Sequence, residues 1–451
     1  MSAVSRFAET LEKQYGIPTV SLVNASIVLS GANTLSRYST GMPLRFVGMP
    51  YPFTGLSRER LKTYLDDKDN VSGKPIMQAV VDGLTAPLTE EEKKTGVPPE
   101  AEAAPEPRFL PPDTEDNLQR LFKDRDWTDY YPIILPTEKR VTAMLKGTSR
   151  KPDELVKEAS GTFGTIRPFT VENVAIIAVM AGAKPEYLPV ILALASQVPY
   201  MDSTTSNASM VLINGPIRKE IGVNSGLGAL GPVAEANSVI GRSMNLIHGV
   251  IQGYKEGVTG FASLSNPLRY NNVTLAENEE ALPEGWLPFH VIRKHKPEDS
   301  VLTVLNGWNF VNCSGSVVEH YQPQLLMRDF TRVLAAANSA TFIMDPSVAY
   351  QLRNTQGFKT QAEFGEWISK NAVTTAETYW ANSITSGMMG PLGKMGLEPY
   401  DSWQKVTGNT LIHHYPEAQN IRVVVAGGNT ASVWFVTDFS PGRGVSIDAW
   451  R

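Results

Sequence analysis

The sequence predicts an α/β protein in three parts: an incomplete doubly wound sheet near the N-terminus, a proline-rich linker and a larger α/β domain. Of the 451 residues, 42% are apolar and 19% are charged, which allows a buried core large enough for two or three domains. Short β-branched runs alternate with longer segments whose apolar residues have helical spacing. This alternation is typical of α/β folds.

Charge and cysteine content exclude several classes of protein. The formal net charge is −5, which gives no general attraction to nucleic acid. A single cysteine, Cys313, excludes an internal disulfide and a cysteine-rich metal site. Residues 171–200 are apolar but interrupted by glycine, proline and charged residues, so no membrane span is expected. Residues 1–14 suggest an amphipathic helix and no secretory leader, so we expect a soluble, cytoplasmic protein.

Residues 1–87 are predicted to form the incomplete sheet. Phe7, Leu11 and Tyr15 have helical spacing, and Gly16 and Pro18 end that helix. Helices are expected over 4–15, 26–38, 57–67 and 75–84, and strands over 17–23 and 44–47. Two parallel strands leave apolar faces and edges uncovered, because parallel sheets are normally buried on both sides. The segment therefore indicates half of a doubly wound sheet.

Residues 88–114 are predicted to be a linker or a strap across a surface. They combine several glutamates with closely spaced prolines, which favour extended backbone. Arg108, Phe109 and Leu110 leave an alternative open, because they could bury themselves in an interface as a structured arm.

Residues 115–451 are predicted to form one α/β domain that binds the substrate. Helices are expected over 137–146, 152–159, 171–181, 185–196, 236–247, 325–337, 362–369 and 372–380. Strands are expected over 210–213, 301–305, 341–344, 421–425 and 432–436. No internal repeat of 20–50 residues is present.

A glycine-rich turn over 213–232 is the strongest local signal. It follows a predicted strand and precedes a helix, and its glycines allow the backbone to approach a ligand. Asn214, Arg218, Asn224, Ser225 and Gly226 are the residues we expect to bind a carboxylate or another small anion of the substrate. The alternative is a packing loop, in which the glycines only permit a tight crossing.

A second stretch, 270–280, contains Tyr270 and three glutamates and lies shortly before His290. Glu277 follows an apolar run and is the carboxylate most expected to point inward. Glu277 and His290 are therefore candidate acid–base groups, and Tyr270 a candidate substrate contact. A run of glutamates is also typical of a solvated face, which is the competing interpretation.

Cys313 is a candidate nucleophile because His320 follows it closely. A buried, unreactive thiol is the alternative. The pair His413 and His414 hints at a metal, but adjacent side chains usually point apart, so no metal site is predicted. No fingerprint of a nucleotide, flavin or haem is present, and the cofactor is left unknown.

Several stretches resemble a known family. Residues 16–20, 41–47 and 50–53 are similar to the later part of the UGSC (seleno)protein domain, which is itself similar to the selenoprotein B components of glycine-type reductases. Residues 136–140, 147–150, 183–189 and 214–220 resemble proteins that accompany that domain or are fused to it. The resemblance covers most of the chain, and the Asn-Gly-Pro-Ile-Arg-Lys-Glu motif at 214–220 is quite specific.

The namesake motif of that family, selenocysteine or cysteine followed by Gly-Ser-Cys, is absent. Residues 313–316 read Cys-Ser-Gly-Ser, which is the wrong order and lies in the other domain. The resemblance therefore implies that a second polypeptide supplies both the missing strands and the redox thiol or selenol.

From this resemblance we expect the large subunit of a hetero-oligomeric enzyme. The thiol or selenol of its partner would cleave or reduce a carbon–heteroatom bond of a small organic substrate bound beside Glu277, with His290 transferring a proton. Two alternatives stay open. One is a thiol-independent lyase or hydratase that uses Glu277 and His290 with or without a metal. The other is a non-catalytic scaffold subunit.

Overall fold

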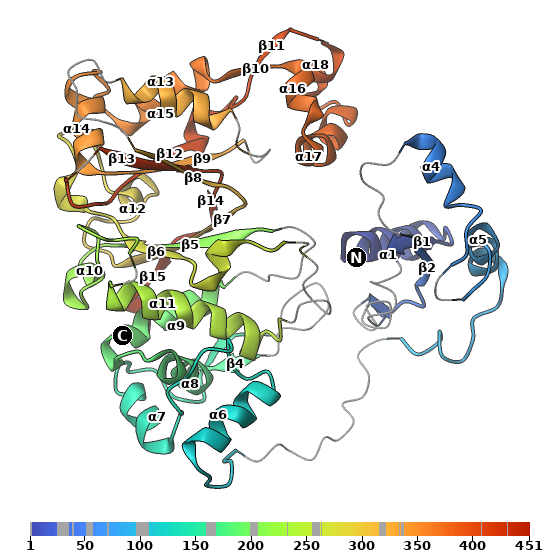
Figure 1. Cartoon of the computed structure of the whole chain (residues 1–451), viewed down its shortest axis with the longest axis horizontal. Coiled ribbons are helices and arrows are strands. Elements are labelled where there is room, and N and C mark those ends of the chain that lie inside the picture. Colours follow the sequence, from blue (N-terminus) through green and yellow to red (C-terminus); the bar gives the residue numbers. More distant parts are fainter. Residues whose placement is uncertain are drawn as a thin grey trace.

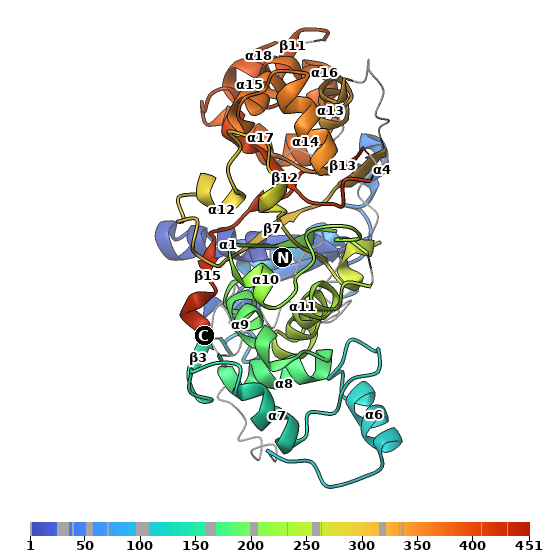
Figure 2. The same ribbon diagram turned by 90° about the vertical axis from the view of Figure 1, so that its left-hand side faces the viewer.

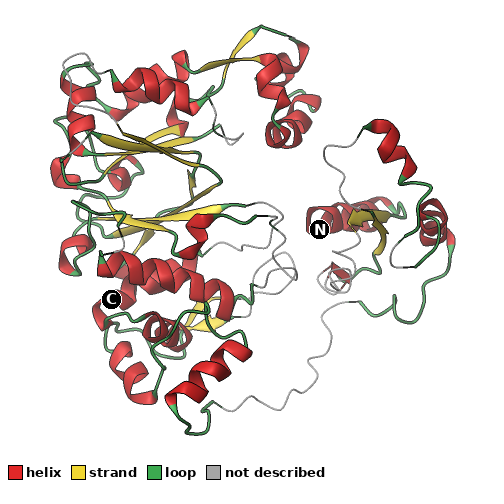
Figure 3. Ribbon diagram, in the orientation of Figure 1, coloured by secondary structure: helices red, strands yellow, loops and turns green. Residues whose placement is uncertain are grey.

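The computed structural model has an α/β fold, as predicted, with helices outside and sheets between them (Figure 3). It describes residues 2–24, 36–37, 40–50, 57–69, 72–95, 108–158, 168–198, 206–231, 233–254, 262, 264–314, 322–332, 334, 338–406, 408–430 and 432–451. The helix predicted over 26–38 falls almost entirely outside these residues.

The N-terminal part contains a two-stranded parallel sheet. Strand β1 (Val20–Asn24) pairs in parallel with β2 (Arg45–Met49), and among the described residues neither pairs with a further strand. A small core of Val47, Ile76 and Ala79 joins the sheet to one helix. The helices of this part are α1 (Ser2–Tyr15), α4 (Arg58–Thr63) and α5 (Ile76–Thr85). In Figure 1 these elements stand apart from the rest of the chain.

The two ends of the predicted linker contact the parts that flank them. Arg45 Nη2 donates to Glu92 Oε2 over 2.9 Å, which attaches the first residues of the segment to β2. At the other end, Arg108 pairs with Glu172 at 2.6 Å, and Leu110 packs against the largest core. Residues 96–107 lie outside the described residues, and the domain boundaries stay a prediction.

Residues 108–451 form four layers, in the order helices, sheet, sheet and helices (Figures 1 and 2). The first sheet has the order β14 (Ser440–Pro441), β7 (Val301–Gly307), β5 (Ala208–Asn214) and β6 (Val273–Ala276), with β15 (Val445–Ser446) also paired to β7. The second sheet has the order β12 (Ile421–Val425), β9 (Ala340–Met344), β13 (Val433–Thr437) and β8 (Phe310–Ser314).

Helices cover the outer face of each sheet. Those on the first sheet's side are α6 (Glu115–Asp124), α7 (Glu138–Leu145), α8 (Val171–Ala181), η1 (Pro185–Tyr187), α9 (Leu188–Gln197), α11 (Glu235–Leu246) and the π-helix η2 (Ile247–Ile251), with a small hairpin of β3 (Leu155–Lys157) and β4 (Phe169–Thr170). Those on the other side are α13 (Pro323–Thr331), α14 (Pro346–Asn354) and α15 (Gln361–Asn371).

The remaining elements are short. A small group contains the antiparallel pair β10 (Val373–Thr375) and β11 (Leu411–His413) with α16 (Ala376–Ala381), α17 (Ser383–Lys394) and α18 (Tyr400–Lys405). Single turns of helix are α10 (Ile217–Glu220), α12 (Phe289–Ile292), η3 (Pro267–Tyr270), η4 (Glu279–Ala281), η5 (Ala418–Asn420) and η6 (Asp448–Trp450).

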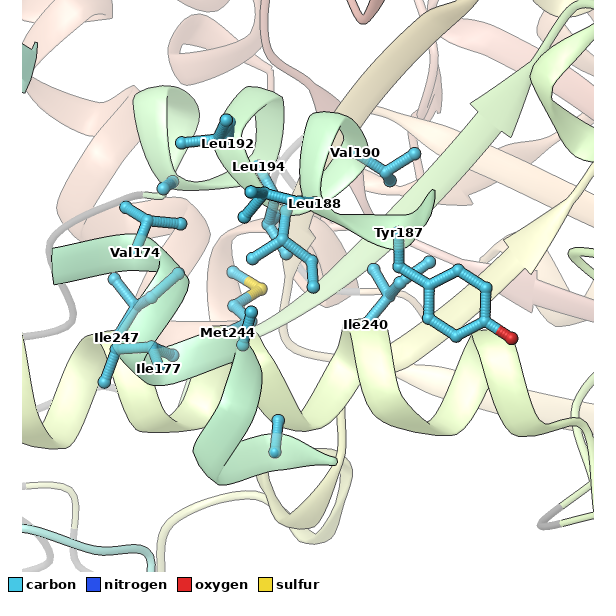
Figure 4. Close-up of a cluster of buried hydrophobic side chains, with 14 of the residues drawn as sticks. Val174, Ile177, Tyr187, Leu188, Val190, Leu192, Leu194, Ile240, Met244 and Ile247 are labelled. Carbon is cyan, nitrogen blue, oxygen red and sulfur yellow. The ribbon is translucent and has the colours of Figure 1, made fainter. Parts of the chain in front are cut away.

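Local sequence explains the best-defined helix, α8. A capping box of Thr170 and Asn173 begins it, and Gly182 ends it in the left-handed conformation (φ 86°). Its side chains enter the largest core, where Val174 and Ile177 face residues of α9 and α11 (Figure 4). The apolar run of α8 and α9 is thus a buried helix pair.

Both sheets are buried on both faces. Along β5, Val211 and Ile213 enter the core beneath the helices, whereas Met210 and Leu212 enter a core between the two sheets. Strands β9 and β12 send Ile343 and Val424 into the same central core and their other residues toward α13, α14 and α15. Successive side chains of a strand enter the cores on opposite faces of its sheet, so these strands join three cores into one structure.

The two halves of this region repeat each other and exchange a strand. In the first half β5 and β6 are parallel and β7 is antiparallel to β5; in the second half β9 and β12 are parallel and β13 is antiparallel to β9. After β7 the chain crosses to the second sheet as β8, and after β13 it crosses to the first sheet as β14. Each unit of this repeat is longer than 20–50 residues, the range of periods in which the sequence shows no internal repeat.

Asp438 ties the two crossings together. This buried residue follows β13, and its carboxylate accepts hydrogen bonds from the backbone N–H groups of Trp308 and Asn309 (2.8 and 2.9 Å) and from Asn309 Nδ2 (2.8 Å). Burial raises the pKa of Asp438, because no cation accompanies these amide donors. One carboxylate thus satisfies the backbone of the opposite crossing.

Several predicted elements are wrong. The helix expected over 152–159 contains strand β3, and the helix expected over 372–380 begins as strand β10. Helices α6 and α14 and strand β8 were not predicted. Within the described part of the chain, no helix combines the length and apolarity needed to cross a bilayer.

We expect Asp438→Ala to lower the free energy of unfolding by about 3 kcal/mol, because two buried backbone N–H groups lose their acceptor. Asp438→Asn keeps one carbonyl oxygen for both groups and should lose much less. Urea unfolding of the two variants measures the difference. Equal losses would show that these hydrogen bonds do not stabilise the crossings.

Candidate functional site

The carboxyl ends of the two parallel strand pairs meet. Asn214 ends β5 and Glu277 directly follows β6, while Asp345 directly follows β9. The backbone N–H of Asn278 donates to the Val425 carbonyl at 2.7 Å, which joins the end of β6 to the end of β12. Ligands of α/β proteins commonly bind at such carboxyl ends, so this junction is the candidate site.

Glu277 is fully buried at the junction. Its Oε2 accepts hydrogen bonds from Asn214 Nδ2 (2.6 Å) and from the backbone N–H of Phe289 (2.7 Å). Burial raises the pKa of Glu277 to about 8, and the nearby charge of Glu279 acts in the same direction. Glu277 therefore carries a proton at neutral pH. The prediction that it points inward agrees with this burial.

Four buried polar atoms beside Glu277 have no hydrogen-bond partner. They are Asn214 Oδ1, Glu277 Oε1, and both ring nitrogens of His290. The side chains lie close together: Asn214 Nδ2 also donates to Glu279 Oε1 over 3.0 Å, and His290 Nδ1 is 3.8 Å from that oxygen. Since buried polar atoms are normally paired, this group has the capacity to bind a small polar ligand.

His290 lies on α12 next to Phe289, whose amide holds Glu277. Burial lowers the pKa of His290, while the charge of Glu279 and the nearby backbone carbonyls of Pro297 and Lys296, which lie outside good hydrogen-bond geometry, oppose that shift. The imidazole is therefore neutral at pH 7 while Glu277 is protonated. A neutral acid beside a neutral base is the arrangement needed to move a proton.

Arg218 is occupied by protein groups. Its Nε donates to the Gly215 carbonyl, Nη1 to the Glu277 carbonyl and to Glu280, and Nη2 to Glu279 and Glu280. These five hydrogen bonds use all five donors of a guanidinium. The hydrogen bond from Arg218 lowers the pKa of Glu280 to about 2. Arg218 thus fixes the Glu279–Glu280 turn and keeps no donor for a substrate anion.

The glycine-rich turn lies against the second half of the repeat. The Ser225 carbonyl accepts from the N–H of Gly427 at 2.9 Å, and Asn224 Oδ1 accepts from the N–H of Gly226 at 2.9 Å. Asn224, Ser225 and Gly226 therefore reach the strand junction. The N–H groups of Asn224 and Gly226 are bonded within the protein, so neither points to a ligand.

Two predicted site residues lie elsewhere. Cys313 is on β8, two strands away from β9, opposite Trp434, and burial raises the pKa of its thiol. His320 falls outside the described residues. Tyr270 lies at the other end of β6 from Glu277, in a cavity of about 450 Å³ together with Tyr130, Tyr131 and Tyr254. Neither residue contributes to the Glu277 cluster.

The two histidines near the C-terminus lie in different surroundings. His414 is buried, and burial lowers its pKa to about 4, whereas the neighbouring His413 is exposed. Within the described ranges, no group of three or more histidine, cysteine, aspartate or glutamate side chains is arranged to hold a metal ion.

Sequence reasoning missed two residues that organise the junction. Asn237 is buried on α11, and its Nδ2 donates to the carbonyls of Asn224, Ala229 and Thr274. Asp345 accepts from the N–H groups of Ser347 and Asn429. An amide on the apolar face of a predicted helix was the signal for Asn237. Asp345 follows a predicted strand, as Glu277 does.

Neither the protein-family models nor the curated proteins compared with this chain give a match. The resemblance to the UGSC domain therefore stays a prediction.

The raised pKa of Glu277 predicts a pH-dependent stability. The folded chain keeps this proton up to about pH 8, while the unfolded chain releases it near the ordinary glutamate pKa of 4.5. The unfolded state then binds fewer protons, so the free energy of unfolding falls as pH rises to 8. Between about pH 7.5 and 8, where His290 and His414 are largely neutral in both states, we expect a loss of about 1 kcal/mol per pH unit.

Glu277→Gln should remove this contribution, because the amide stays neutral. Urea unfolding at intervals of pH measures it. Glu284→Gln, at an exposed position (96% of the side chain), is the matched control and should keep the wild-type slope. Equal slopes in all three proteins would show that Glu277 is ionised in the folded state.

Proposed function

We propose that the chain is an enzyme that transfers protons to and from a small organic substrate, in the class of the lyases and hydratases. The observation that supports it is the cluster of unpartnered polar atoms on Asn214, Glu277 and His290. Active sites are where burial moves the pKa values of acids and bases in opposite directions.

The roles follow from the protonation states. Neutral His290 removes a proton from carbon, and Glu277 gives its proton to the hydroxyl on the adjacent carbon. The carbon–oxygen bond then breaks, water leaves and a carbon–carbon double bond remains. Hydration of the double bond follows the same steps in reverse order. Asn214 holds the Glu277 carboxyl through its 2.6 Å hydrogen bond and leaves its own Oδ1 for the substrate.

The cluster lies one side chain below the surface. Glu279 is 12% exposed and lies beside Asn214 and His290, and Glu280, which Arg218 also holds, is 50% exposed. In this proposal a movement of the Glu279–Glu280 turn admits the substrate. Arg218 is then a positioning residue for the entrance.

Exchange of carbon-bound hydrogen in D₂O tests the proposal without knowledge of the complete reaction. A panel of methyl esters of small 3-hydroxy and unsaturated carboxylic acids, chosen uncharged because Arg218 keeps no donor for an anion, is followed by proton NMR. We expect Glu277→Gln and His290→Gln each to slow exchange by at least about a hundredfold, because general acid–base catalysis contributes that much. Cys313→Ala and Glu284→Gln should exchange at the wild-type rate.

Exchange at the wild-type rate in Glu277→Gln would contradict this proposal. So would a wild-type chain that exchanges the carbon-bound hydrogen of none of the panel's esters. A rate that falls in Cys313→Ala would instead indicate thiol chemistry.

A second candidate is a subunit whose partner supplies a thiol or selenol, in line with the resemblance to the UGSC domain. The open sheet of β1 and β2 favours it, since each strand has a free edge among the described residues. Phe7 (66%) and Tyr15 (68%) also expose large apolar side chains on α1. Burial raises the pKa of Cys313, so the one thiol of this chain stays protonated. In this candidate the nucleophile therefore comes from the partner chain.

Hydrogen exchange of the chain alone and co-expressed with neighbouring reading frames tests this candidate. With a partner, we expect the amides of β1 and β2 to become protected, because strand addition pairs their open edges. Amides of β9, which pairs on both sides, are the internal control and should be protected in both samples. A monodisperse chain that is active alone would contradict the subunit candidate.

A further inference from the structure

A cavity of about 880 Å³ lies at the amino end of β12, at the opposite end of that strand from the Glu277 junction. Residues from α12, the start of α15 and the turn η5 line it. Leu287, Phe289 and Ile292 give it an apolar wall. Two arginines, Arg293 and Arg422, also line it. The cavity contains none of the residues assigned to proton transfer.

Neither arginine has a carboxylate partner among the described residues. Arg293 Nη2 donates to the Gly442 carbonyl at 2.7 Å, while its Nε is buried and without a partner. Arg422 Nη1 donates to Ser339 Oγ at 2.7 Å and to the Asn420 carbonyl at 3.1 Å. These neutral acceptors leave both positive charges uncompensated, in contrast to Arg218 with its two glutamates.

The two guanidinium groups disfavour each other's charge. Burial lowers the pKa of Arg422 to about 10, and the charge of Arg293 contributes to this shift. Burial also lowers the pKa of Arg293. Two partly buried cations without a counter-charge are costly, and an anion between them would remove that cost.

Other groups around the cavity fit an anion with an apolar body. The first residues of α15, Gln361 and Ala362, line the cavity, so the positive end of that helix dipole faces it. Glu366 is the acidic group on the lining, and its side chain is 61% exposed at 3.9 Å from Lys370. Its charge is therefore screened by solvent and by that lysine.

We propose that this cavity binds a small organic carboxylate, whose charged group lies between Arg293 and Arg422 and whose carbon chain contacts Leu287, Phe289 and Ile292. The proposal does not depend on proton transfer by Glu277. It assigns the cavity a ligand class that follows from its two unpaired cations and its apolar wall.

Isothermal titration calorimetry with hexanoate tests it, with hexanol and inorganic phosphate as comparison probes. We expect hexanoate to bind the wild-type chain more tightly than either probe. Arg293→Gln and Arg422→Gln should each weaken hexanoate binding by at least about tenfold, because a charge-assisted hydrogen bond is lost. Arg328→Gln, whose guanidinium pairs with Asp329 on α13, is the matched control and should bind as the wild type does.

A second variant keeps the test valid if an arginine variant fails to fold. Ala362 is exposed on the lining, so Ala362→Trp fills the cavity and leaves both guanidinium groups in place. It should also abolish hexanoate binding. Failure of hexanoate to bind the wild type, unchanged binding in Ala362→Trp, or equal affinity for hexanol would overturn the proposal. Tighter binding of phosphate than of hexanoate would overturn the carboxylate assignment.

Discussion

The exchange of strands between the two sheets is the constraint on which the rest of residues 108–451 depends. Strand β8 follows the first half but pairs in the second sheet, and β14 follows the second half but pairs in the first. Neither sheet can form completely without the other half of the chain. The parallel strands occupy equivalent positions in the two halves. The carboxyl end of β6 therefore meets that of β12, where the Asn278 N–H donates to the Val425 carbonyl. The position of the candidate site is thus a consequence of the exchange.

Glu277 lowers the stability of the fold at the junction. A buried carboxyl without a cation stays neutral, and its unpartnered oxygen forfeits a hydrogen bond that water would provide. A leucine there would avoid both losses but would leave the buried N–H of Phe289 without its acceptor. Local rules of stability are most often broken at functional sites, where the loss is offset elsewhere. Here the three cores around the two sheets are large enough to tolerate it.

The sequence predicts local features of this protein better than distant ones. Helix α8 is predicted at its observed bounds because its cap, its apolar run and Gly182 are all adjacent in the chain. The inward position of Glu277 was predicted because it follows an apolar run, and His290 was a candidate because it lies shortly after the glutamates. The role of Arg218 was not, since its partners Glu279 and Glu280 are about sixty residues away. The strand exchange has no sequence signature, because β8 contains Asn312 and Cys313 in place of an apolar alternation. Tertiary packing decides in which of the two sheets a strand pairs.

Helix α12 separates a neutral buried acid from a cation that has no carboxylate partner among the described residues. Phe289 at its start holds the Glu277 carboxyl, and Arg293 at its end lines the cavity with Arg422. An ion pair between Glu277 and Arg293 would ionise the acid and compensate the guanidinium, yet Glu277 accepts from Asn214 and Phe289, and Arg293 donates to the Gly442 carbonyl. The backbone of a four-residue helix keeps them on different sides. In the two proposals each group is left for a ligand: an acid without a cation and a cation without an acid, which pairing with each other would have satisfied.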